Sequence, residues 1–249
     1  MHGLNSNGFT PHFNPDSLLG KELAPKSDRL YCLHVEQNLL CNFSQQEEVS
    51  MTTQQIIQLE RGVNGVEVEA ILVSLTDKNL IDVERYWQPH LEETSEADQF
   101  WDWEQKHRIY TRNAQYESYA IECEGMTQGL MLVAIRGYRS WIESQRRLVY
   151  VHSIATAPWN RTQLQNPVEY RLVGTTLLEF ARFRSYELGY GGLVGLHALP
   201  GAEGFYRKLQ FMDCGVDEEK ENLAYFEWYQ RQSTESDEWD EWEDETDGI

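Results

Sequence analysis

Hydrophobic positions between residues 51 and 232 form two kinds of pattern, which together predict a mixed α/β domain. Short apolar or alternating segments bounded by glycine, proline or polar residues are typical of strands, whereas apolar positions that recur every three or four residues are typical of helices. The expected strands cover residues 66–75, 116–125, 129–138, 147–157, 191–199 and 222–229. The expected helices cover residues 77–93, 95–112, 171–188 and 201–209.

The boundaries of several elements carry their own signals. Asp77 and Ser95 are suited to cap the first two helices, and Gly125 to Gly129 is expected to be the turn of a hairpin. Helices follow strands repeatedly along the chain, an order typical of an α/β fold. The predicted fold class is therefore α/β, a mixed sheet with helices on both faces.

Three zones of different composition set the domain organisation. Residues 51–232 are dense in apolar and aromatic side chains and are the predicted domain, without an internal repeat. Residues 1–50 carry scattered Asn, Pro, Ser and Gly and are expected to be a flexible N-terminal extension; Met51 is an alternative start of the natural chain. Residues 233–249 carry nine acidic residues and are expected to be a disordered tail.

Charge and cysteine content narrow the classes of partner. The formal net charge is −20, so the surface is poorly suited to nucleic acid and tolerates cationic substrates better. Four scattered cysteines do not suggest a disulfide framework, and no convincing metal-ligand spacing is present. The chain has no long apolar run and no secretory signal pattern, so a cytoplasmic protein without a membrane partner is expected.

One short stretch is a candidate for binding phosphate. Arg171 and Gly174 stand where a predicted helix begins. The first turn of a helix has unpaired N–H groups and a positive dipole end, and glycine lets an anion approach the backbone closely. A P-loop, a dinucleotide fingerprint and a nucleophile elbow are all missing from the sequence. A plain helix start, with glycine for close packing, is the alternative interpretation.

Two motifs around this stretch resemble the GNAT superfamily of acyl-CoA-dependent N-acyltransferases. The resemblance covers residues 66–230 in element order and 147–211 in motif. The family's phosphate loop, Gln/Arg-x-x-Gly-x-Gly/Ala, falls on Arg171, Gly174 and Thr176, with Thr176 as a departure. The family's late helix motif is matched by Ala202, Phe205, Tyr206, Lys208 and Phe211, whereas Gln210 replaces a glycine, Leu199 replaces an asparagine, and the segment 159–170 is longer than usual.

The resemblance implies acetyl-CoA or another acyl-CoA as co-substrate and no metal. The pyrophosphate would lie on the backbone N–H groups of the loop, with a charge-assisted bond from Arg171. The pantetheine arm would pair with the strand before the loop, through Ile154, Ala155 and Thr156. The implied cofactor-binding residues are Ile154, Ala155, Thr156, Arg171, Leu172, Val173, Gly174, Thr175 and Thr176.

Direct acyl transfer needs a proton donor for the thiolate and a way to obtain a neutral amine. Tyr206 matches the tyrosine that often serves as the acid in this family. Strand alternation places Tyr150, His152 and Ile154 on one face, which makes His152 the candidate base and His197 a second one. Core packing is the alternative role for both Tyr206 and His152.

The sequence says less about the acceptor of the acyl group than about the acyl-CoA co-substrate. The aromatic residues of the first two predicted helices would form a wall of the acceptor cleft, and the acidic surface favours an amine-bearing small molecule or a lysine side chain. A homodimer and a basic partner for the acidic tail are further expectations. The alternatives to an enzyme are a catalytically silent acyl-CoA sensor and an interaction protein that works through its tail.

Overall fold

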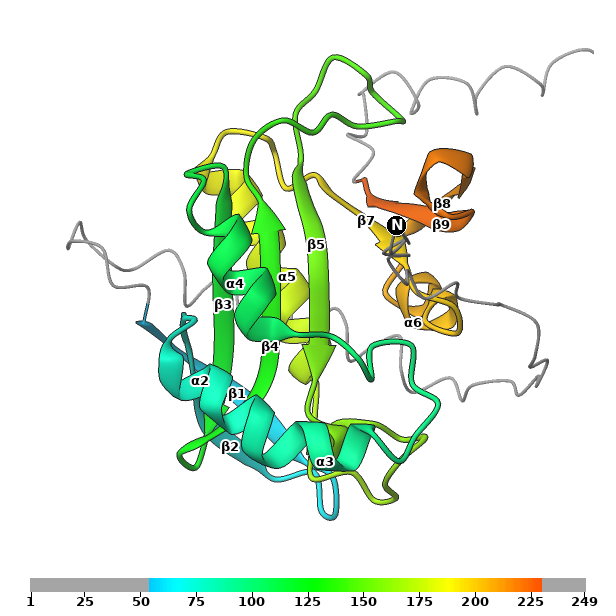
Figure 1. Ribbon diagram of the computed structural model, residues 1–249. Coiled ribbons are helices and arrows are strands. Elements are labelled where there is room, and N and C mark those ends of the chain that lie inside the picture. Colours follow the sequence, from blue (N-terminus) through cyan, green and yellow to red (C-terminus); the bar gives the residue numbers. More distant parts are fainter. Residues whose placement is uncertain (1–53, 230–249) are drawn as a thin grey trace, which may run out of the picture.

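The computed structural model describes residues 54–229. The predictions for the N-terminal extension and for the acidic tail lie outside the described residues. Figure 1 shows a single curved sheet with one group of helices in front of it and another behind.

Nine strands form this sheet, in the order β6-β1-β2-β3-β4-β5-β7-β9-β8. Neighbouring strands are antiparallel except for β5 and β7, which are parallel. The strands are β1 Gln54–Arg61, β2 Glu67–Ser74, β3 Tyr116–Cys123, β4 Met126–Ala134, β5 Val149–Thr156, β6 Tyr170–Arg171, β7 Val194–Ala198, β8 Met212–Asp217 and β9 Leu223–Trp228.

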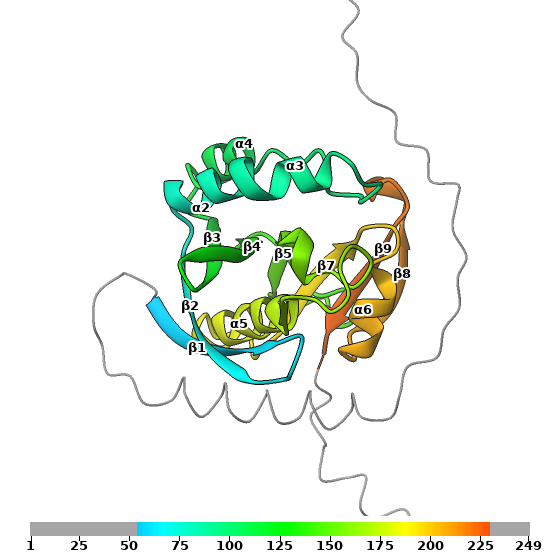
Figure 2. The same ribbon diagram turned by 90° about the horizontal axis from the view of Figure 1, so that it is seen from below.

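The helices cover both faces of the sheet, and the predicted fold class is confirmed (Figure 2). On one face lie α2 Asp77–Asp82, the π-helical segment η1 Val83–Trp87, α3 Gln88–Leu91 and α4 Trp103–Tyr110. On the other face lie α5 Val173–Glu187 and α6 Glu203–Lys208. The short 3₁₀ segments are η2 Pro158–Asn160 and η3 Glu218–Lys220.

Each face has its own apolar core. On the α5 side, Leu177 and Phe180 pack with Leu59 of β1 and Leu72 of β2, so the N-terminal hairpin curls against this helix. On the other side, Trp87 and Trp103 pack with Leu132 of β4. The burial of these large side chains, at about 25 cal/mol per Å² of apolar surface, stabilises both layers.

The first predicted helix forms, but both predicted N-caps are wrong. Thr76 and Asn79 form a capping box at the start of α2, so Asp77 is the first helical residue instead of the cap. The second helix begins at Trp103 because the Asp102 carboxylate accepts a hydrogen bond from Gln105 N at 2.7 Å. Ser95 lies in the preceding loop, where turns replace the first part of the predicted helix.

Three strands of the sheet were not expected from the sequence: β1, β6 and β8. β1 carries three glutamines and an exposed isoleucine and has only a weak apolar pattern, yet seven of its residues pair with β2. At its far end, Glu60 pairs with Arg171 and Arg61 with Tyr170, which forms β6. The N-terminal hairpin therefore holds the chain just before α5.

Candidate active site

The parallel pair β5 and β7 separates along its length. Val149, Tyr150 and Val151 pair with residues 194–196, and beyond them β5 continues to Thr156 without a partner strand on that side among the described residues. An unpaired strand edge inside a sheet offers N–H and C=O groups to an extended ligand. The splayed edge of β5, residues 152–156, is the first component of the site.

The loop between β6 and α5 is the second component. Leu172 has a left-handed backbone with φ of 70°, directly before the helical Val173. Consecutive left- and right-handed residues turn neighbouring N–H groups toward one point, which forms an anion-binding nest. The helix dipole adds a positive potential there. This geometry suits a phosphate group.

The N–H groups of the loop are not all equivalent. Thr176 N donates to Leu172 O at 2.8 Å, and its side chain is buried. The N–H groups of Val173, Gly174 and Thr175 remain at the open end of the helix. Of the loop residues implied by the resemblance, Thr176 therefore turns inward, and these three are best placed to receive an anion.

Two glycines bring the loop close to the end of β5. A Cβ at position 129 would lie 2.6 Å from Val173 Cγ1, so only glycine lets α5 approach β4 this closely. A Cβ at position 174 would lie 3.2 Å from Phe205 Cζ and 3.6 Å from Thr156 Cγ2. Gly174 therefore faces the space between β5 and α6, next to the splayed edge.

Arg171 and Thr156 already form some hydrogen bonds within the protein. One guanidinium N–H of Arg171 donates to Gly62 O at 3.1 Å, and the side chain is exposed beside the loop. The carbonyl of Thr156 accepts two hydrogen bonds from Arg161, which Asp98 holds in a bidentate ion pair. Arg161 thus fixes the end of β5 and leaves Thr156 its N–H and side chain for other contacts.

Tyr206 lies in the core beneath the site. Its ring contacts Phe205, Phe211 and Phe226, and its side chain is almost fully buried. Burial raises the pKa of Tyr206, so the hydroxyl stays protonated at neutral pH. Within residues 54–229 this hydroxyl forms no side-chain hydrogen bond.

A β-bulge changes the predicted faces of β5. Leu132 pairs with Ser153 but Val133 pairs with Val151, so His152 has no partner on β4. The extra residue reverses the alternation: Tyr150 and His152 face α4, whereas Ile154 packs against the α5 core. The prediction that all three share a face is wrong for Ile154 because period-two alternation fails at a bulge.

His152 lies against the splay in an aromatic and cationic setting. Its ring is 4.3 Å from that of Tyr110, and its Nδ1 is 3.1 Å from Ser153 Oγ. Burial, with the charges of Lys106 and Lys220, lowers the pKa of His152 to about 4. This histidine is neutral at physiological pH, and within residues 54–229 its ring has no hydrogen bond to a carboxylate that would stabilise its protonated form.

His197 on β7 belongs to a hydrogen-bonded chain. Its Nε2 lies 3.0 Å from Asp217 Oδ2, and its Nδ1 lies 2.8 Å from the Tyr150 hydroxyl. A carboxylate only accepts, so Nε2 carries the hydrogen and Nδ1 accepts from Tyr150. Burial lowers the pKa of His197, whereas Asp217 opposes that shift. The arrangement can move a proton from Tyr150 to an imidazole that a carboxylate stabilises. The sequence identified Tyr150 and His197 as separate residues but did not reveal the hydrogen bond between them or the Asp217 carboxylate on the other side of the imidazole.

Within residues 54–229, no group of three or more His, Cys, Asp or Glu side chains is arranged to hold a metal ion. Over the same range, no helix combines the length and apolar character needed to cross a membrane.

No family model and no curated protein matches this chain. Solved structures to which it is similar include the GNAT domain of S. lividans PAT, at 11% identity and a TM-score of 0.45, covering 73% of this chain and 99% of that one. Another is the PaiA N-acetyltransferase from Thermoplasma acidophilum in complex with coenzyme A, at 12% identity and a TM-score of 0.43, covering 65% and 99%. A GNAT-family acetyltransferase from Listeria monocytogenes has 14% identity and a TM-score of 0.42, covering 69% and 99%.

Proposed function

We propose that this chain is a GNAT-type N-acyltransferase that moves an acyl group, most simply acetyl, from acyl-CoA to a primary amine. The observation that carries the proposal is the meeting of two components at one end of β5: a strand edge without a partner and a nest at the start of α5. One suits an extended arm with amide groups, and the other suits a pyrophosphate. Coenzyme A has both parts in that order. The cytoplasm remains the predicted compartment.

In this proposal the acyl group would lie at the splay, between Tyr206 on one side and Tyr150 and His197 on the other. Tyr206, protonated because burial raises its pKa, serves as the proton donor to the thiolate that leaves. The chain Tyr150–His197–Asp217 serves as the proton acceptor for the attacking amine. The C–S bond of the thioester breaks as the C–N bond forms, and the proton lost by nitrogen passes to this chain. His152, the base expected from the sequence, borders the same space as a neutral ring.

Binding and turnover test the proposal separately. CoA should raise the melting temperature, because a ligand that binds only the native state stabilises that state by mass action. At a CoA concentration of a hundred times Kd, the free energy of unfolding should rise by about 2.7 kcal/mol. Acetyl-CoA with a panel of primary amines should release free thiol, measured with a thiol reagent. Thermal stabilisation by CoA without turnover of any amine would favour the sensor. Absence of both effects would refute the proposal.

A further inference from the structure

A cluster of arginines surrounds a pocket at the other end of β5. The pocket has a volume of about 220 Å³ and is lined by Arg136, Gly137, Tyr138, Arg139 and Arg147. All three arginines are exposed, and no carboxylate among residues 54–229 forms an ion pair with them. Glu143, on the same loop, is already paired with Arg146 and accepts from the Tyr229 hydroxyl. We refer to Arg136, Arg139 and Arg147, together with the space between them, as the arginine pocket.

Arginines that form no ion pair within residues 54–229 create a local demand for an anion, and only Arg139 is partly satisfied, through a hydrogen bond to Gln145 O at 2.8 Å. Their charges repel one another, and a bound carboxylate relieves that repulsion while it accepts bidentate hydrogen bonds. The chain as a whole has a formal charge of −20, so a local cluster of positive charge is opposite in sign to the net charge of the protein. Screening confines the field of an exposed charge to ~10 Å at 0.1 M salt. The pocket therefore acts on groups that lie close to it.

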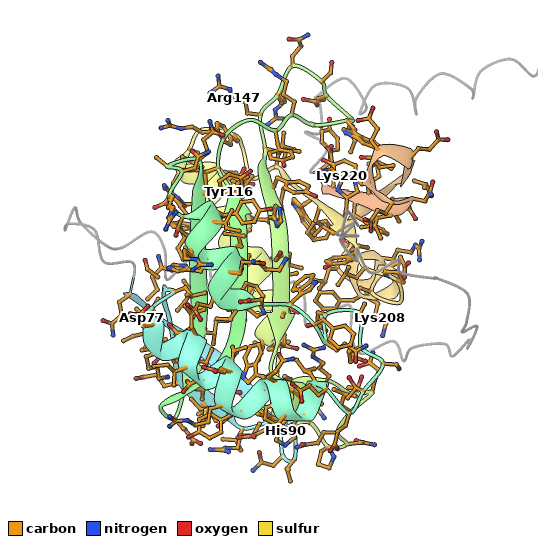
Figure 3. The ribbon with its side chains drawn as sticks, in the orientation of Figure 1. Asp77, His90, Tyr116, Arg147, Lys208 and Lys220 are labelled. Carbon is orange, nitrogen blue, oxygen red and sulfur yellow. The ribbon has the colours of Figure 1, made fainter. Side chains whose placement is uncertain are left out.

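The arginine pocket connects directly to the proton-accepting chain. The Tyr138 ring, which lines the pocket, stacks on the Tyr150 ring at 4.1 Å and 6°. Tyr150 is the residue that bonds to His197. Arg147 lies two residues before β5 begins and precedes Tyr150 by three residues, which corresponds to ~10 Å of extended chain. In Figure 3, Arg147 lies at the upper end of the sheet, and His90 lies at the opposite end.

The nest and the arginine pocket lie at opposite ends of β5, so each end can bind a different part of the substrates. The nest adjoins Thr156 at the C-terminal end, and the arginine pocket precedes Val149 at the N-terminal end, with the splay between them. An acceptor whose amine reaches the splay from the N-terminal side would pass the arginine pocket. Lys106 and Lys220 add positive charge beside His152 in the same space.

We propose that the arginine pocket binds an anionic group of the acceptor, such as a carboxylate, separated from the reacting amine by several bonds. The proposal rests on the N-acyltransferase function proposed above. It sharpens the expectation drawn from net charge, which favoured a basic acceptor: the acceptor carries an amine at one end and an anion at the other. The arginines are specificity-determining residues and do not touch the reacting atoms.

A matched pair of acceptors tests the proposal on the full chain. 6-Aminohexanoate and pentylamine differ only by the carboxylate. With acetyl-CoA, wild-type protein should show a kcat/KM about tenfold higher for 6-aminohexanoate, through KM. The double variant Arg136→Gln/Arg147→Gln should bring this ratio close to one, and Arg85→Gln, an exposed arginine of η1, should leave it unchanged. An equal ratio in wild type and in the double variant would overturn the proposal.

Calorimetry with 6-aminohexanoate in the presence of CoA separates this proposal from the enzyme assignment. Binding to wild type and at least tenfold weaker binding to the double variant supports an anion site even if neither amine turns over. Equal binding to both proteins overturns it. A third protein, with the nine acidic residues of 235–247 changed to Asn or Gln, tests whether the chain's own tail is the anion. A more than tenfold gain in affinity on that change would assign the pocket to the tail and overturn its role in acceptor binding.

Discussion

The two ends of β5 differ in the kind of group that they offer to a ligand. At the C-terminal end, the groups offered are backbone N–H groups of Val173, Gly174 and Thr175 and the free edge of the strand. At the N-terminal end, they are side chains: the hydrogen-bonded chain that starts at Tyr150, and the arginine pocket. Backbone groups persist when a side chain is shortened, whereas side-chain groups vanish with it.

This difference predicts opposite sensitivities to mutation. The nest should fail when atoms are added, because a new side chain fills the space that glycine leaves open. The N-terminal end of β5, where the acceptor is proposed to enter, should lose function when atoms are removed, because the groups there are individual hydroxyl, imidazole and guanidinium groups. Substitutions at Gly174, at Tyr206 and at the two histidines probe this contrast, in order of decreasing effect.

Gly174→Glu should reduce affinity for CoA by 100-fold or more. The new carboxylate would enter the space beside Phe205 and Thr156 and oppose the pyrophosphate; two like charges at 4 Å cost about 4 kcal/mol near a protein surface. Calorimetry with CoA measures the loss. Gly174→Gln, of the same size but neutral, should bind appreciably better than the Glu variant. A Glu variant that binds CoA as wild type does would remove the nest from the site.

Tyr206→Phe should lower kcat by ~10²-fold, the range for one positioned acid, with little change in CoA affinity. The substitution keeps the ring contacts with Phe211 and Phe226, so the melting temperature should stay close to that of wild type. Steady-state kinetics and CoA titration are the measurements. Full activity in this variant would leave Tyr206 as a core residue only.

His197→Gln should lower kcat by about tenfold, and His152→Gln by less than twofold. The pKa of His152, about 4, means that this ring is neutral at all pH values above 5, so its removal should not alter the pH–rate profile there. Replacement of His197 interrupts the path from Tyr150 to Asp217, so its effect should grow as the pH falls and the amine becomes more protonated. The reverse ranking would restore His152 as the base.

The same contrast explains which parts of the site were predictable from sequence. The nest depends on adjacent residues, so Arg171, Gly174 and the following helix were recognisable in one short segment. The alternation of β5 was predictable only up to His152, because a bulge leaves no signature in residue types alone. Ile154 was therefore placed on the wrong face, and its role in holding an arm along β5 stays a prediction.

The acceptor end depends on residues that the sheet brings together from distant segments. Tyr150, His197 and Asp217 belong to three strands, and β8, which carries Asp217, was not expected. The arginine pocket was missed because three exposed arginines in a loop resemble an ordinary solvated surface until the loop folds back on itself. β1 was missed because its glutamines weaken the strand pattern, which only its pairing with β2 completes.

β1 gives the loop before α5 a property beyond its shape, namely preorganisation. Leu172 holds a left-handed backbone, which for a residue other than glycine costs of order 1–2 kcal/mol. The preceding residues, Tyr170 and Arg171, are held in place by Arg61 and Glu60. The conformational entropy of the loop is thus lost when the domain folds, and an anion that arrives later meets N–H groups already converged, so less of its binding free energy is spent on ordering the chain.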